Sequence, residues 1–182
     1  MSVILKPEAA GLFGHFEISA YDALRGGKRV YHVTKKNQIT DYARQVVLEM
    51  LTQYGIGGSP GQQHPEYNQL WSLGIGTDPT PANASQIDLG AEVLTKVFAR
   101  PAEVLYVGHP TYEIHCSMTF GVTEANAVAP LCEVGIFTRG DNDDPYFPAA
   151  DRYMYSRQTF SPFVKTVTMT IVINWIFGMT IA

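Results

Sequence analysis

Residues 165–177 read KTVTMTIVINWIF, and along this stretch apolar side chains recur at every second position. The apolar positions are Val167, Met169, Ile171, Ile173, Trp175 and Phe177. Because successive side chains of a strand point to opposite faces, a period of two predicts a long strand with one buried face. Residues 164–182 are also the one membrane candidate. A spanning helix needs about 20 predominantly apolar residues, so the interspersed threonines favour the strand, and we expect no membrane partner.

Further strands are predicted on both sides of a central turn-rich region. Apolar runs bounded by turn residues occur at 12–20, 28–33, 70–76, 103–107, 111–122, 131–138 and 151–158. Residues 89–100 fit either a short helix or a bent strand. Gly26 and Gly27 separate the first two runs, and paired glycines tolerate the positive φ of a hairpin turn. In the run at 70–76, Trp71, Leu73 and Ile75 are expected on one face.

One segment has helical spacing. Residues 37–54 read NQITDYARQVVLEMLTQY, with apolar side chains three and four positions apart. This spacing predicts an amphipathic helix over 39–54, with Thr40 at its N-cap and Gly55 at its end. The fold class expected is therefore mainly β (α+β): an antiparallel β-sandwich with one packed amphipathic helix. We divide the chain into an N-terminal hairpin arm, 1–36, and a β-sandwich docking domain, 37–182.

The composition narrows the classes of function. Acidic residues number 17 and basic residues 13, giving a formal net charge of −4, which disfavours nucleic acid as the main partner. Charged residues make up 16% of the chain, below the roughly 25% of an average soluble domain. A chain with so little charge is expected to have part of its surface covered by other chains, in the first place copies of itself.

No motif in the sequence predicts catalysis or a cofactor. A G-x-S-x-G elbow is missing from the sequence, and we expect no enzyme and no cofactor. The weak metal candidates are Asp141, Asp143 and Asp144, whose spacing does not match an EF-hand loop. Cys116 and Cys132 are interpreted as buried thiols of a protein made in a reducing cytoplasm. On a strand, His115 and Cys116 must point to opposite faces, so one of them is expected in the core.

Two glutamates lie among apolar residues, and each is expected either on the outward face of its strand or in an ion pair. Glu133 lies in the run LCEVGIF, and Glu92 precedes VLTKVFAR. An unpaired buried carboxylate is very costly, which favours an ion pair over a catalytic dyad. The pairs considered are Glu133 with Arg100 and Glu92 with Arg157.

The segment from residue 70 to 137 carries a recurring pattern of short motifs. A strand ending in Gly-x-Gly-Thr (LWSLGIGTDPTP, 70–81) is followed by DLGAEVLTKVFAR (88–100), YEIHCSMTFGV (112–122) and EVGIF (133–137). This pattern resembles tailed-bacteriophage virion proteins related to the attachment domain of tail-collar fibres. The residues that match are Gly74, Gly76, Glu92, Arg100, Glu133, Gly135 and Phe137. The helical segment 37–51 matches the short helix that often precedes this domain.

The resemblance implies a structural virion protein that assembles as an oligomer in the tail, baseplate or collar region. Such a domain docks a fibre or spike, so the implied partners are copies of this chain and other virion proteins. The implied location is the virion, after synthesis in the host bacterium. Since the sequence stops at Ala182, without a fibre shaft, a free-standing subunit is expected. The alternatives are a capsid decoration (cement) protein, a phage receptor- or carbohydrate-binding β-sandwich, and a small hydrolase.

Three further expectations follow from this interpretation. The aromatic side chains of two loops have the composition of interfaces: Tyr146, Phe147, Tyr153 and Tyr155. Gly76 is expected to adopt a positive φ at a turn. Residues 1–33 are expected to reach onto a neighbouring subunit by strand addition, so that their deletion leaves a folded core.

Overall fold

The computed structural model describes residues 11–36, 38–39, 70–98, 103–108, 111–126, 129–139 and 152–180. Most of these residues lie in strands. In chain order the elements are β1 (Gly11–Asp22), the short 3-10 helix η1 (Ala23–Arg25), β2 (Lys28–Lys36), β3 (Gln38–Ile39), β4 (Leu70–Gly76), β5 (Glu92–Val97), β6 (Glu103–Gly108), β7 (Thr111–Phe120), β8 (Leu131–Arg139), β9 (Arg152–Phe163) and β10 (Met169–Thr180).

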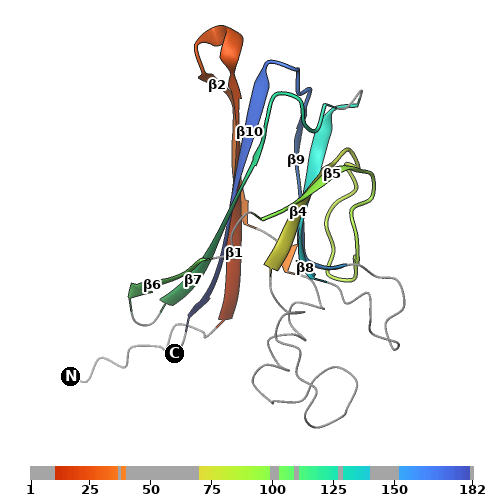
Figure 1. Ribbon diagram of the computed structural model, residues 1–182. Helices are drawn as coiled ribbons and strands as arrows, with labels where there is room; N and C mark the ends of the chain where they lie inside the picture. The colour runs from red at the N-terminus through yellow and green to blue at the C-terminus, as the bar shows by residue number, and fades with distance from the viewer. Residues whose placement is uncertain are drawn as a thin grey trace, which may run out of the picture.

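The strands form two five-stranded antiparallel sheets (Figure 1). The first has the order β2-β1-β10-β7-β6 and the second the order β3-β9-β8-β4-β5. Each sheet therefore combines strands from both halves of the chain, and the chain passes between the sheets after β2, β5, β7 and β9. The prediction of a mainly β protein is confirmed.

The core lies between the two sheets and is built by the alternation seen in the sequence. On β10, Ile171, Ile173 and Trp175 are fully buried, and they belong to the same cluster as Leu73 and Ile75 of β4. Phe16 of β1 contacts both sheets, with its ring centroid 5.5 Å from that of Trp175 and 6.4 Å from that of Phe160 on β9. One hydrophobic cluster thus joins both sheets in a sandwich-like arrangement.

Contacts between the sheets are present at both edges. At one edge, the hydroxyl of Tyr31 on β2 donates to the Ser161 carbonyl at 2.6 Å, and its ring stacks on Phe163 of β9 at 4.2 Å. At the other edge, Lys96 Nζ of β5 donates to the Thr119 carbonyl of β7 at 2.8 Å. These contacts fix the two sheets relative to each other.

The predicted strands are confirmed, with differences in detail. Residues 89–100 contain the strand β5 rather than a helix, opposite an irregularity in β4 between Ile75 and Gly76. Gly26 and Gly27 have φ of 67° and 73°, as the hairpin requires. The expected positive φ at Gly76 is wrong, because Gly26 and Gly27 are the positive-φ glycines among the described residues.

The expected helix is not seen. Its first position, Ile39, lies in the strand β3, where Gln38 and Ile39 pair with β9; residues 40–54 lie outside the described residues. Among the described residues, helical structure is limited to η1. None of the helices in the described part of the chain is long and apolar enough to cross a membrane.

The N-terminal hairpin is part of the first sheet rather than a separate arm. β1 lies between β2 and β10 and pairs with β10 from Gly11 to Asp22. Phe16, Ile18 and Ala20 are fully buried in the shared core. The packing therefore does not follow the expected division at residue 36, and β1 is already paired on both edges.

Candidate functional site

The structure brings together six of the seven residues on which the family resemblance rests. Gly74 and Gly76 lie on β4, Glu92 on β5, and Glu133, Gly135 and Phe137 on β8. In the register of these strands, Gly74 is opposite Gly135 and Gly76 is opposite Glu133. Arg100 lies outside the described residues. The motif therefore defines one region of the second sheet, which residues 77–91 cover.

Leu89 from this covering loop contacts the two facing glycines. A Cβ atom at Gly74 would lie 2.9 Å from Leu89 Cδ1, and one at Gly135 would lie 2.9 Å from Leu89 Cδ2. Leu89 is buried and clusters with Phe137 and Met154. The glycines thus leave the space in which the Leu89 side chain packs onto the sheet.

Glu133 connects the sheet to the backbone of the same loop. Its side chain is fully buried. Oε1 accepts hydrogen bonds from the backbone N–H groups of Asp78 at 3.1 Å and Ala91 at 2.8 Å. Oε2 accepts from the N–H of Gly90 at 3.0 Å. The carboxylate therefore holds both ends of the loop.

Arg157 of β9 is the counter-ion of Glu133. Its Nε and Nη2 atoms lie 3.0 and 2.8 Å from Glu133 Oε2. Nη1 donates to the Thr80 carbonyl at 2.8 Å and to Gln86 Oε1 at 3.1 Å, and Nη2 contacts Asp78 Oδ2 at 3.2 Å. All five guanidinium donors thus have an acceptor. Hydrogen bonds from Thr80, together with the charge of Arg157, lower the pKa of Asp78.

We call the buried ion pair of Glu133 and Arg157 a clasp, because it connects the second sheet to residues 77–91. Both charged groups are fully buried, and residues of this chain occupy their hydrogen-bonding positions. Of the two placements expected for Glu133, the structure shows the paired one, and the partner is Arg157, on the strand next to β8. The expected pair of Glu92 with Arg157 is wrong, because Glu92 contacts Arg152.

Arg152 makes a second, more exposed clasp on the same loop. Its guanidinium stacks over the ring of Phe137 at 4.0 Å. Nη2 donates to Asp88 at 2.8 Å and to Glu92, while Nη1 donates to Thr95 Oγ1 at 2.8 Å. Together the two arginines of β9 hold the loop through side-chain and backbone contacts.

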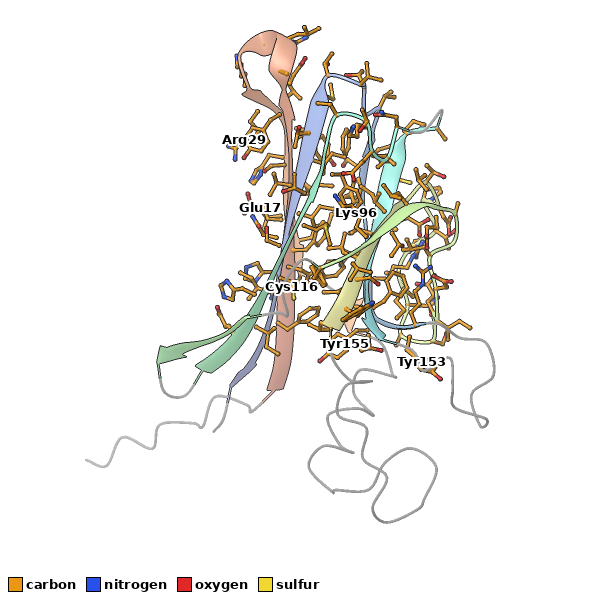
Figure 2. All side chains as sticks on the ribbon, viewed as in Figure 1. Glu17, Arg29, Lys96, Cys116, Tyr153 and Tyr155 are labelled. Carbon is orange, nitrogen blue, oxygen red and sulfur yellow. The ribbon has the colours of Figure 1, made fainter. Side chains whose placement is uncertain are left out.

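Both cysteines are free and buried, as predicted. Burial raises the pKa of Cys116 to about 12 and also raises the pKa of Cys132. His115 points to the opposite face from Cys116, as expected for a strand, and its Nε2 lies 2.7 Å from Glu113 Oε2. Figure 2 shows Cys116 directed between the sheets. These thiols are protected rather than activated.

The remaining candidate residues are not brought into one site. Asp141, Asp143, Asp144, Tyr146 and Phe147 lie outside the described residues. Tyr155 packs edge-on against Phe177 at 4.9 Å, and burial raises its pKa. Figure 2 places Tyr153 and Tyr155 at the end of the molecule away from the β1–β2 turn. Within the described residues, no three His, Cys, Asp or Glu side chains are grouped to hold a metal ion.

Trp71 does not share the core face with its neighbours. Leu73 and Ile75 are fully buried, whereas Trp71 is 36% exposed. The pairing of β4 with β8 shifts between Leu70 and Ser72, and such an irregularity interrupts the alternation of side chains. The expectation that these three side chains share one face is wrong at Trp71.

Sequence reasoning missed four exposed apolar side chains at the end of the molecule that carries the β1–β2 turn. We define the loop end as residues 23–27, 121–126 and 164–168, which lie at one end in Figure 1. Its exposed apolar side chains are Leu24 (82%), Val122 (39%), Val164 (54%) and Val167 (68%). The signal in the sequence was apolar residues inside turn segments, where polar residues are the norm.

Hydrogen bonds connect the three segments of the loop end. The N–H of Ala23 donates to the Thr168 carbonyl at 2.9 Å. Lys165 Nζ lies 3.3 Å from the Val122 carbonyl and 2.8 Å from Asn126 Oδ1. The exposed apolar side chains are therefore carried on segments that are fixed to one another.

Comparison with models of protein families, with curated proteins and with solved structures gives no match. Nothing in these comparisons links the chain to the tail-collar attachment domain. The resemblance thus stays a prediction from the motif residues.

Proposed function

We propose that the protein is a structural subunit of a tailed-bacteriophage virion, which assembles with copies of itself in the tail, baseplate or collar region. In this proposal the two sheets form a β-sandwich docking domain, and the loop end is the surface that contacts other virion proteins. The residues of the resemblance supply its framework, because they build the clasp under residues 77–91. The protein acts by binding and assembly rather than by turnover of a substrate.

The observation that carries the docking role is the exposure of four apolar side chains on the linked segments of the loop end. Exposed apolar residues that gather in one place mark sites of protein contact, whereas single ones are ordinary. Arg25 and Lys28, which are close to Leu24 in the chain, are exposed as well, and charged side chains are typical of the rims of protein interfaces. Segments that are already ordered lose little conformational entropy on binding.

Incorporation into particles tests this proposal. The double variant Leu24→Ser/Val167→Ser removes the two most exposed apolar side chains of the loop end. The matched control is Ile87→Ser/Val97→Ser, which changes two exposed apolar residues elsewhere, 82% and 51% exposed. Each variant replaces the wild-type gene in the phage, and immunoblotting measures the amount of chain per purified particle. We expect incorporation of the loop-end variant to fall at least about tenfold, the change that 1.4 kcal/mol of lost binding produces.

The control separates a docking defect from a folding defect. Both variants are expected to unfold at urea concentrations close to that of the wild type, because the exposed side chains add little to stability. Normal incorporation of the loop-end variant would contradict docking through this surface. Absence of the wild-type chain from particles would contradict the virion role.

A further inference from the structure

A buried amine and a carboxamide face each other at the base of the loop end. Lys165 is 3% exposed, although it follows β9 in a connecting segment. Its Nζ lies 2.8 Å from Asn126 Oδ1, 3.3 Å from the Val122 carbonyl and 3.5 Å from the Thr166 carbonyl. Burial lowers the pKa of Lys165, while the charge of Glu124 opposes this effect. Desolvation of this kind increases the nucleophilicity of an amine.

The distance suits attack of the amine on the carboxamide carbon. A C=O bond is about 1.2 Å long, so Nζ lies no more than about 4 Å from Asn126 Cγ. This is close to the separation of about 3–3.5 Å from which such reactions start. Asn126 Nδ2 donates to the Val122 carbonyl at 2.9 Å, which holds the carboxamide in place. The exposed position of Asn126 gives the leaving group a path to solvent.

The charge of one carboxylate acts on Lys165. Glu124 precedes Asn126 by two residues and interacts electrostatically with Lys165. Its Oε2 accepts hydrogen bonds from the N–H of Gly121 and from Lys96 Nζ, both at 2.8 Å. These contacts fix the side chain and lower the pKa of Glu124, chiefly through Lys96. The charge of this carboxylate opposes the effect of burial on the pKa of Lys165.

We propose that Lys165 and Asn126 form an intramolecular isopeptide bond. A bond forms between Lys165 Nζ and Asn126 Cγ, and the bond between Cγ and Nδ2 breaks. The lysine ammonium gives up two protons, one before the attack and one as the new amide forms, and both end on the leaving nitrogen, so that ammonium is released. The reaction needs no oxidant, reductant or cofactor.

The bond would join the segment after β7 to the segment between β9 and β10. These segments belong to the loop end and carry Val122, Val164 and Val167. The two cross-linked residues are 39 positions apart in the chain, so the bond would restrict the unfolded state much as a disulfide does. The proposal does not depend on the virion role, since the reacting groups belong to one chain.

The mass of the denatured full-length protein tests the bond. We expect an intact mass lower by one ammonia molecule than the mass calculated from the sequence. Trypsin is expected to leave the acylated Lys165 uncut and to release one species that joins the peptides containing Asn126 and Lys165. An intact mass equal to the calculated one would overturn the proposal. A loss of ammonia confined to the Asn126 peptide, which indicates a succinimide, would overturn it as well.

A variant tests the role of Asn126. Asn126→Ala removes an exposed side chain, and we expect that variant to fold and to have its full calculated mass. A mass lower by one ammonia molecule in Asn126→Ala would overturn the assignment of Asn126 as the reacting carboxamide.

Discussion

At the residue scale, Gly76 is required for steric reasons. A Cβ atom at this position would collide with the Ala91 carbonyl and with the Glu133 carboxylate. We expect Gly76→Ala to lower the free energy of unfolding by about 1–3 kcal/mol through overpacking. Urea denaturation measures the change. Gly121→Ala is the control, since a Cβ there would meet only Glu124 Oε2 at 3.7 Å; equal stability of the two variants would contradict the steric account.

The clasp formed by Arg157 predicts a large loss of stability. Arg157→Met leaves the Glu133 carboxylate buried without its counter-ion, which is expected to cost about 3–5 kcal/mol in unfolding free energy. Arg152→Met, on the same strand but with a side chain that is 23% exposed, is expected to cost about 1 kcal/mol. Chemical denaturation of both variants compares the two values. If Arg157→Met lowered the free energy of unfolding by less than Arg152→Met does, the buried pair would not hold the loop.

The raised pKa of Cys116 predicts a loss of stability in alkali. In the unfolded chain the thiol ionises near its ordinary value of 9.0, whereas burial keeps it protonated up to about 12 in the folded protein. Its contribution to stability is therefore complete below pH 9.0 and is lost as the pH rises toward 12. Unfolding at several alkaline pH values should show a steeper loss in the wild type than in Cys116→Ala. An equal decrease of stability with pH in the wild type and in Cys116→Ala would contradict the burial of the thiol.

The pairing of Glu133 was one of the possibilities open from the sequence, but the identity of its partner was not predicted. Apolar neighbours on both sides of a carboxylate are a local signal, and they left two placements open, the outward face of the strand and an ion pair. The partner lies on the adjacent strand, where the register places Arg157 opposite Gly135, and it is 24 positions from Glu133 in the chain. The same limit explains why the contact between Leu89 and the glycines was not predicted.

At the element scale, β10 shows how far periodicity determines a strand. The alternation of residues 165–177 correctly predicted the burial of Ile171, Ile173 and Trp175. It did not locate the beginning of the strand, which starts at Met169, so that Val167 lies in the preceding turn and is 68% exposed. Strand ends depend on the neighbouring strand, which the local pattern does not contain.

The hairpin of β1 and β2 predicts the effect of an N-terminal deletion. Because β1 supplies Phe16, Ile18 and Ala20 to the core, removal of residues 1–36 would expose β10 and leave a large void. We expect the truncated chain to lack a cooperative thermal transition, as followed by circular dichroism. The full-length chain is the control. A cooperative transition in the truncated protein would instead support a separable N-terminal arm.

At the scale of the whole molecule, the proposal of contact with other chains rests on the low charge of the chain and on the exposed apolar side chains of the loop end. The clasp under residues 77–91 orders the second sheet, and Lys165 orders the loop end. Fold class and strand positions followed from local patterns. The loop end could not be predicted from local patterns, because it combines three segments that are distant in sequence and come together only in the folded chain.

The most direct test of the virion role is immunogold electron microscopy of purified phage particles, with an antibody against this chain. Particles that carry an epitope tag on a known tail protein serve as the control for labelling. The account predicts label at one position in the tail, baseplate or collar region, and a band for the chain in an immunoblot of the same particles. Label over the head would support the capsid decoration alternative, and absence of the band from the particles would contradict the virion role.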